Sequence, residues 1–228
     1  MKQFLIITLL LCGTIALAQT PKGAWKSQEP TGSTSTLIVT DNYMIIASYS
    51  VLNKSYERTE GGPFTIQGDQ MTYTPEFNPS DTAKVGIPIV YTVTMKDGIL
   101  TLKYDEAMVW MKIDDGGNSA FTGAWKVSDK EGDLKSQLTG TRKAVKLVSG
   151  TRYQWIVFDT VEKTFYKTGG GTYTFKNGKY TERIEFLSSD NNRVGTTQVF
   201  DSKLDNGVWD YKGTNTAGKP IHEIWEKM

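Results

Sequence analysis

Cysteine and histidine are almost missing from this chain: Cys12 and His222 are its only examples. Cys12 lies in an apolar leader, so the remaining chain holds no disulfide, thiolate metal site or cysteine nucleophile. A single histidine excludes a cluster of histidine ligands, and no Gly-x-Ser-x-Gly elbow presents a nucleophilic serine. Strand alternation places His222 outward beside Ile224, as a surface histidine. We therefore expect no metal, no cofactor and no conventional catalytic triad.

A surplus of charge is also missing. The chain has 26 basic and 25 acidic residues, and removing Lys2 with the leader leaves 25 of each. Nucleic-acid binding normally requires a basic surplus, so we expect no nucleic-acid partner. After the leader, no apolar run approaches the ~20 residues that cross a bilayer. We therefore expect no transmembrane segment in the mature chain.

Residues 1–18 have the pattern of a secretory signal peptide. Lys2 precedes an apolar run from Phe4 to Leu17, and Ala16-Leu17-Ala18 is a small-x-small cleavage site. A lipid-anchored protein would have a small residue before its cysteine, whereas Leu11 precedes Cys12. The sequence predicts an exported protein, periplasmic or extracellular, without a lipid anchor.

Helical periodicity is absent from the rest of the chain. Its residues are rich in Thr, Tyr, Val, Ile, Phe and Trp, and the apolar positions alternate, which is typical of strands. Turn signals recur about every ten residues. They are Asn53-Lys54, Gly61-Gly62-Pro63, Gly68-Asp69, Asp97-Gly98, Asn177-Gly178 and Asn206-Gly207. The pattern predicts an all-β fold with little helix.

An internal repeat divides the chain. Gly-Ala-Trp-Lys occurs at residues 23–26 and again at residues 123–126, and similar segments follow both copies in the same order. The aligned pairs are 61–66 with 170–175, 97–98 with 206–207, and 110–112 with 225–227. An ordered series of matches indicates duplication. We predict a first barrel over residues 19–113, a linker over 114–122 and a second barrel over 123–228.

The linker begins with Asp114-Asp115, but it lacks the regular carboxylate spacing of a calcium loop. Each module has the length of about eight short antiparallel strands. Closing such a sheet into a barrel removes its edges, and a sandwich is the alternative.

A Gly-x-Trp in the first strand and a basic residue in the last resemble the lipocalin, or calycin, pattern. The stretches 178–186 and 223–227 are similar to lipocalin-like proteins exported by some bacteria. The resemblance implies two tandem up-and-down barrels, each closed by a cation–π contact, Trp25 with Lys112 and Trp125 with Lys227. Lipocalins generally use arginine where this chain has lysine. The polar run from Ser128 to Arg142 would be the long loop beside the second barrel's mouth.

Alternate residues of a barrel strand point inward. Alternation assigns to the interior Tyr180, Glu182, Ile184 and Phe186 on one strand, and Ile221, Glu223, Trp225 and Lys227, with Trp225 pointing inward, on the last. Thr181, Arg183 and Glu185 then face water. Two buried carboxylates, Glu182 and Glu223, require partners, raised pKa values or a ligand. Arg152, Arg193 and Lys227 are the candidate partners.

The first module has Tyr73 and Met108 where the second has Glu182 and Glu223. Both carboxylates are therefore dispensable for the barrel, which favours a polar site in the second module; the alternative is two solvated rim glutamates. Aromatic side chains would supply the apolar area of such a site. We predict as ligand-binding residues Tyr153, Trp155, Tyr173, Tyr180, Glu182, Arg193, Glu223 and Trp225. Gly169-Gly170-Gly171 precedes strand sequence rather than a helix, so it indicates a bulge or a tight entry into the strand, not a phosphate loop.

We expect a non-enzymatic protein that binds a small apolar or amphipathic ligand in the second barrel. An envelope or surface interaction module with filled barrels is the alternative. A carbohydrate- or lipid-acting enzyme with a glutamate pair remains a third reading, which no residue spacing supports.

Overall fold

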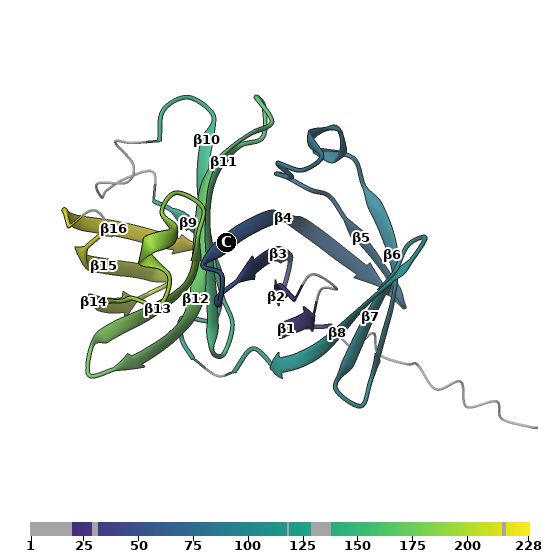
Figure 1. The fold of residues 1–228 in the computed structure, drawn as a ribbon, viewed down its shortest axis with the longest axis horizontal. Coiled ribbons are helices and arrows are strands. Elements are labelled where there is room, and N and C mark those ends of the chain that lie inside the picture. The colour runs from purple at the N-terminus through teal and green to yellow at the C-terminus, as the bar shows by residue number, and fades with distance from the viewer. Residues whose placement is uncertain (1–19, 29–31, 118, 129–137, 216–217) are drawn as a thin grey trace, which may run out of the picture.

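The chain folds into two closed β-barrels (Figure 1). The computed structural model describes residues 20–28, 32–117, 119–128, 138–215 and 218–228. The predicted leader and most of the polar run from Ser128 to Arg142 lie outside the described residues. Each barrel has eight antiparallel strands, which confirms the predicted all-β tandem barrels and excludes the sandwich. No helix in the described ranges is long and apolar enough to cross a membrane.

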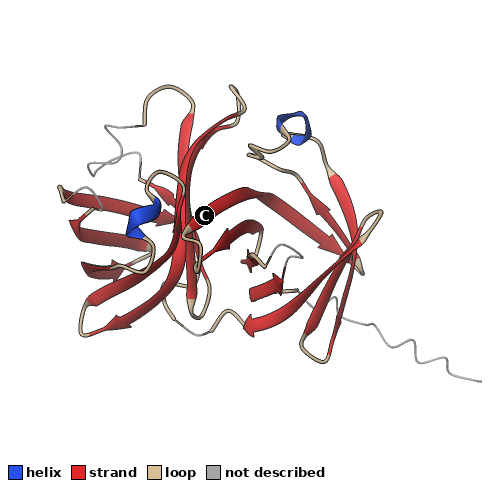
Figure 2. Cartoon of the chain, viewed as in Figure 1, coloured by secondary structure: helices blue, strands red, loops and turns tan. Residues whose placement is uncertain are grey.

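The elements of the first barrel are β1 (Gly23–Gln28), β2 (Thr34–Val39), β3 (Tyr43–Ser50), β4 (Ser55–Gln67), β5 (Gln70–Tyr73), η1 (Thr82–Lys84), β6 (Ile89–Lys96), β7 (Ile99–Lys103) and β8 (Ala107–Asp114). Those of the second barrel are β9 (Gly123–Val127), β10 (Arg142–Val148), β11 (Arg152–Asp159), β12 (Thr164–Lys176), β13 (Lys179–Leu187), η2 (Asn191–Arg193), β14 (Thr197–Asp205), β15 (Val208–Thr214) and β16 (Pro220–Lys227). The two 3₁₀ turns, η1 and η2, are the helices drawn in Figure 2.

The two barrels share one strand register. Trp25 pairs with Leu37 on β2 and with Lys112 on β8. Trp125 pairs in the same way with Lys146 on β10 and with Lys227 on β16. Equivalent positions of the two modules can therefore be compared residue by residue.

Most of the expected turns are hairpin turns. Asp97, Asn177 and Asn206 have φ values of 51°, 53° and 48°, the left-handed conformation that such turns require. Gly61-Gly62-Pro63 was expected to be a turn, and this expectation is wrong: the three residues lie inside β4. A Cβ atom on Gly62 would lie 2.0 Å from the carbonyl oxygen of Thr74, so this glycine lets the backbones approach closely.

Glycines also shape the equivalent strand of the second barrel. The pairing of β12 with β13 shifts register between Gly170 and Gly171, in agreement with the expected bulge. Beyond the bulge, Phe186 does not join the aromatic cluster inside the barrel, contrary to the alternation. Its ring instead stacks on Tyr49 of the first barrel, with 4.6 Å between ring centroids.

The barrels pack against each other through β2–β4 of the first and β10–β13 of the second (Figure 1). Apolar side chains fill the contact; those on the central strands are Ile38, Tyr43, Ile45, Val145, Leu147, Ile156 and Phe158. Buried Gln154 donates a hydrogen bond to Thr59 across the junction, at 2.9 Å. Glu185, expected to face water, accepts a hydrogen bond from Tyr49 and pairs with Arg152. Strands β3, β10 and β11 are consequently buried on both faces.

Asp114 forms a second connection between the barrels. Its carboxylate accepts hydrogen bonds from the first barrel through Ala24 N and from the second through Ser149 Oγ, Gly150 N and Thr151 N. Burial alone would raise the pKa of Asp114, but hydrogen bonds led by the Thr151 hydroxyl outweigh it and lower the pKa. The first residue of the expected linker therefore belongs to β8 and holds the turn between β10 and β11.

Candidate functional site

One end of each barrel is closed by a tryptophan. Trp25 and Trp125 are buried, and each indole N–H donates to the backbone carbonyl four residues earlier, at 2.8 and 2.7 Å. The Nζ atom of Lys112 lies 5.1 Å from the Trp25 ring centroid, and that of Lys227 lies 5.7 Å from Trp125. Both lysines are therefore within the range of a cation–π contact.

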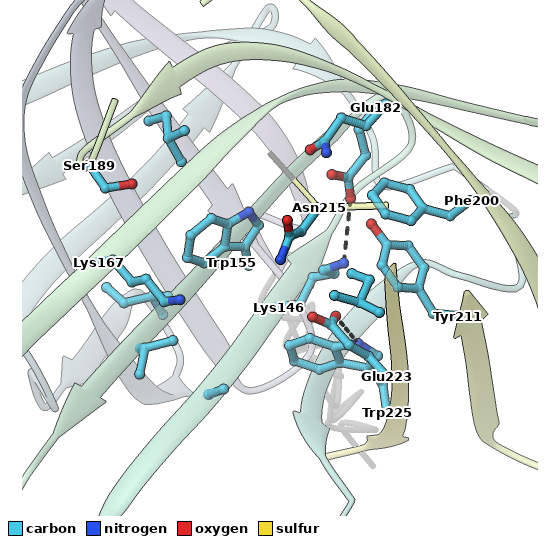
Figure 3. A pocket seen from close by; sticks show the side chains of 16 residues that line it. Lys146, Trp155, Lys167, Glu182, Ser189, Phe200, Tyr211, Asn215, Glu223 and Trp225 are labelled. Atoms are coloured by element: carbon cyan, nitrogen blue, oxygen red, sulfur yellow. Dashed lines mark hydrogen bonds and ion pairs between the residues drawn. The ribbon is translucent and has the colours of Figure 1, made fainter. Parts of the chain in front are cut away.

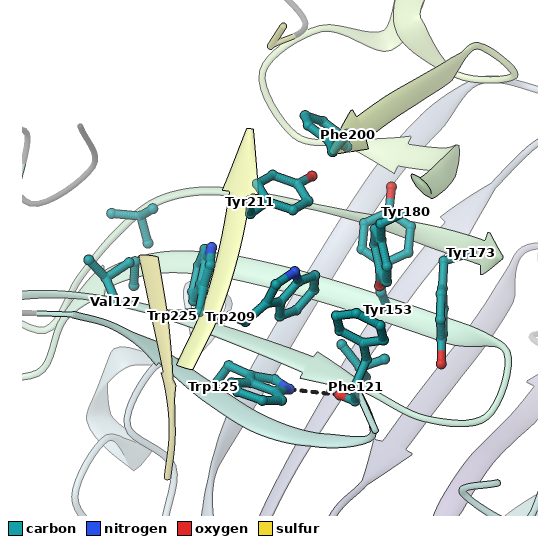
Figure 4. Close-up of a cluster of buried hydrophobic side chains, with 13 residues drawn as sticks. Phe121, Trp125, Val127, Tyr153, Tyr173, Tyr180, Phe200, Trp209, Tyr211 and Trp225 are labelled. Atoms are coloured by element: carbon teal, nitrogen blue, oxygen red, sulfur yellow. Dashed lines mark hydrogen bonds between the residues drawn. The ribbon is translucent and has the colours of Figure 1, made fainter. Parts of the chain in front are cut away.

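The interiors of the two barrels differ in chemistry. The first is filled mainly by aliphatic and aromatic side chains: Trp25, Leu37, Val39, Met44, Ile46, Phe64, Met71, Tyr73, Tyr91, Leu100, Leu102 and Trp110. Near Tyr73, Glu60 of β4 accepts a hydrogen bond from Asn78 at 2.7 Å. The second interior is dominated by aromatic rings, whose labelled members surround Trp209 in Figure 4.

A cavity of about 230 Å³ lies in the second barrel. Its aromatic wall includes Trp155 of β11, Phe200 of β14, Tyr211 of β15 and Trp225 of β16. Its charged residues are Lys146, Lys167, Glu182 and Glu223 (Figure 3). The space is therefore partly apolar and partly ionic.

Lys146 is the central charge of this cavity. Its Nζ atom lies 3.4 Å from Glu182 Oε1, and the two side chains are 2% and 3% exposed. The ammonium group also lies 4.1 Å from the Tyr211 ring centroid and 5.0 Å from that of Trp225. A buried ammonium requires such partners because desolvation penalises its charge. Lys146 and Glu182 thus satisfy much of each other's charge.

Glu223 is the second carboxylate of the cavity. Its Oε2 accepts a hydrogen bond from Trp225 Nε1 at 3.1 Å. Burial raises the pKa of Glu223, while Lys146 and the indole hydrogen bond oppose the rise and Glu182 adds to it. In Figure 3 the Lys146 ammonium lies between the carboxylates of Glu182 and Glu223.

The first barrel has none of these three ionisable residues at the equivalent positions. Its strand pairings place Leu37 where the second barrel has Lys146, and Tyr73 where it has Glu182. Met108 stands in place of Glu223, since Met108 pairs with Leu102 as Glu223 pairs with Tyr211. Because the barrel closes without this group, its presence in the second barrel points to a role other than folding.

Four of the eight residues predicted to bind ligand line the cavity. They are Trp155, Glu182, Glu223 and Trp225. Tyr153, Tyr173 and Tyr180 lie in the buried aromatic cluster instead, where Tyr173 and Tyr180 stack with 4.8 Å between centroids. Burial first, and then Glu182, raise the pKa of Tyr153 well above its usual range.

The expected cationic partners of the carboxylates lie elsewhere. Arg193 pairs with Asp190 at 3.6 Å and is not among the cavity residues. Arg152 serves the junction between the barrels, and Lys227 covers Trp125. His222 lies 3.0 Å from Asp210. The sequence analysis did not identify Lys146, which is the cationic partner of Glu182. The repeat contains the signal for it: Lys146 pairs with Trp125 as Leu37 pairs with Trp25, so a lysine stands where the first barrel has an apolar side chain.

No protein-family model matches this chain, and no curated protein matches it. The two eight-stranded antiparallel barrels are compatible with a lipocalin-like fold. Among the described residues, no group of three or more His, Cys, Asp or Glu side chains is placed to hold a metal ion. The candidate site is therefore defined by the cavity of the second barrel and its charges.

Proposed function

We propose that this protein is an exported, lipocalin-like binding protein that holds a small, partly apolar molecule in its second barrel. Aromatic rings supply apolar contact area, and Glu182, Lys146 and Glu223 orient the polar part of the ligand. The observation that carries the proposal is the placement of all three ionisable groups in one barrel, at positions where its partner has Leu37, Tyr73 and Met108. The predicted leader supports export to the periplasm or beyond the cell.

The size of the cavity limits the ligand. An apolar cavity of about 150 Å³ holds a benzene molecule, so about 230 Å³ accommodates a ring with a short substituent. A long lipid chain exceeds this space. A compact molecule with one flat apolar part and one polar end fits it best.

Native mass spectrometry of the mature protein, purified from a cell that exports it, tests the proposal. We expect a species heavier than the polypeptide by one small molecule. Ala144 lines the cavity, and Ala144→Phe should fill it and abolish that species. Glu182→Gln should weaken retention. Full retention by the filled variant would place the molecule elsewhere and contradict the proposal.

An interaction module is the second candidate, supported by one feature of the first barrel. Ile99 and Met111 pair across β7 and β8 and are 36% and 45% exposed, and nearby Val109 is 50% exposed. Exposed apolar neighbours on a sheet face are typical of contact surfaces. Sedimentation of the mature protein with and without Met111→Lys tests self-association through this face. If both proteins are monomeric, the protein does not self-associate through β7 and β8.

A further inference from the structure

The charges of the second barrel's cavity are unequally partnered. Lys146 and Glu182 form a buried ion pair with each other. Glu223 receives a neutral hydrogen bond from Trp225 and forms no ion pair with any residue that the structure describes. Lys146 and Glu182, which are buried, and Glu223, which is partly buried, together carry two potential negative charges and one positive charge. One further cation would balance them.

Lys167 provides the remaining positive charge, but it lies at an exposed position of β12. Its Nζ atom is 6.0 Å from the Trp155 ring centroid, on the rim of the cavity (Figure 3). Solvent and salt screen a charge at such a position more than one in the interior. Lys167 therefore offsets only part of the negative charge that Glu223 brings.

The cavity wall is suited to a cation. Tyr211 and Trp225 already stabilise the ammonium group of Lys146 through their ring faces, at 4.1 and 5.0 Å. Trp155 and Phe200 contribute further aromatic surface to the same cavity. An ammonium group with a flat apolar substituent would thus have rings to pack against and a carboxylate to pair with.

The volume sets the size of such a ligand. Benzene has six non-hydrogen atoms and occupies a cavity of about 150 Å³, so about 230 Å³ corresponds to roughly nine. A six-membered ring with a two-carbon chain and one nitrogen has this size.

We propose that the ligand of the second barrel is a small primary amine with a flat apolar part, and that Glu223 is the carboxylate that pairs with its ammonium group. This inference rests on the proposed binding function and adds the chemical class of the ligand to it. Lys146 and Glu182 remain paired, and Tyr211 and Trp225 contact the bound amine.

Three phenyl probes of different charge test the inference: 2-phenylethylamine and 2-phenylethanol, which have the same number of non-hydrogen atoms, and 3-phenylpropanoate, which is slightly larger. Their affinities for the mature protein are measured by calorimetry at neutral pH. We expect the amine to bind at least about tenfold more tightly than the alcohol, because a hydrogen bond to a charged group is stronger than a neutral one. The carboxylate should bind most weakly.

Substitutions assign the preference to one residue. Glu223→Gln should bring the amine and alcohol affinities to within about threefold of each other, because it removes the charge and keeps the shape. Glu226→Gln is the matched control, since Glu226 is an acidic residue on the same strand and hydrogen-bonds Ser128 instead. It should leave the ratio unchanged. Lys167→Gln should strengthen amine binding severalfold.

A pH series on the unsubstituted protein gives an independent readout if Glu223→Gln fails to fold. The groups facing Glu223 are Lys146 of β10, Lys167 of β12, Glu182 of β13 and Tyr211 of β15. Protonation of Glu223 competes with the amine, so amine affinity should fall toward acidic pH more steeply than alcohol affinity. Parallel pH profiles would contradict the role of the carboxylate.

The outcomes separate the two proposals. Equal amine and alcohol affinities, or a preference for 3-phenylpropanoate, overturn the cation inference and leave cavity binding intact. If none of the three probes binds and Ala144→Phe changes nothing, both the inference and the proposed function fail. A tenfold preference that survives Glu223→Gln would reject Glu223 as the pairing group.

Discussion

The ammonium nitrogen of Lys146 lies 3.4 Å from a carboxylate oxygen of Glu182, inside a barrel whose other side chains are mostly aromatic. Both groups are almost inaccessible to water, so each depends on the other for its charge. Desolvation makes such a pair costly to build and more costly to break.

We predict that Lys146→Met destabilises the protein by about 3–5 kcal/mol, because it leaves the Glu182 carboxylate buried without its cation. The double variant Lys146→Met, Glu182→Met should recover most of this loss, since two flexible apolar side chains of similar length replace the pair. Urea unfolding measures both free energies. Equal destabilisation in the single and double variants would show that the pairing itself is unimportant.

The fold could be predicted from the sequence because its signals are local. Asp97-Gly98, Asn177-Gly178 and Asn206-Gly207 encode their own turns, and the repeated Gly-Ala-Trp-Lys marks equivalent first strands. The two carboxylates of the cavity were also predicted, since Glu182 and Glu223 interrupt otherwise apolar faces.

Strand alternation alone does not single out Lys146, because β10 is buried on both faces, by the cavity on one side and by the first barrel on the other. Its neighbours Val145 and Leu147 are apolar because they pack against the first barrel. Both faces of β10 are therefore rich in apolar residues, and alternation no longer shows which face points into the second barrel. Phe186 was misplaced for a related cause: it follows a bulge at Gly170 and Gly171 and packs against the other barrel. Contacts between modules leave no periodic signal in either one.

Glu223→Gln should change how stability depends on pH. Burial raises the pKa of Glu223, so the protonated carboxyl favours the folded state, and this contribution is lost as pH rises through the folded pKa. The Glu223→Gln variant has no carboxyl group to deprotonate, so its stability does not fall for this reason as pH rises. Its stability relative to the natural protein should therefore increase as pH rises above the usual pKa of a glutamate. Urea unfolding at several pH values checks this; a difference that shrinks as pH rises would contradict it.

Asp114→Asn should weaken the connection between the barrels. The carboxylate of Asp114 accepts from Ser149, Gly150 and Thr151 of the second barrel, and an amide cannot accept at both positions. We expect the free energy of unfolding to fall by about 1–3 kcal/mol at neutral pH.

Because hydrogen bonds lower the pKa of Asp114, its contribution to stability is present above the unfolded pKa and disappears as pH falls through the folded pKa. The variant and the natural protein should thus converge in strongly acidic solution. Asp115→Asn, at the exposed neighbouring position, is the control.

Lys112 and Lys227, the lysines that cover the tryptophans at the barrel ends, should contribute similarly to the free energy of unfolding. Lys112 and Lys227 lie over Trp25 and Trp125 at 5.1 and 5.7 Å, in the same register of the two barrels. Replacing either lysine by methionine keeps the apolar stem and removes the charge, so each variant should lose about 0.5–1 kcal/mol. Arginine at either position should retain the stability, because its guanidinium also packs on indole faces. Lys203→Met, at a side chain that is 78% exposed, should have no comparable effect. Thermal and urea unfolding of the five variants measure these differences, and equal stability of the methionine and arginine forms would show that the ring–cation contacts contribute nothing.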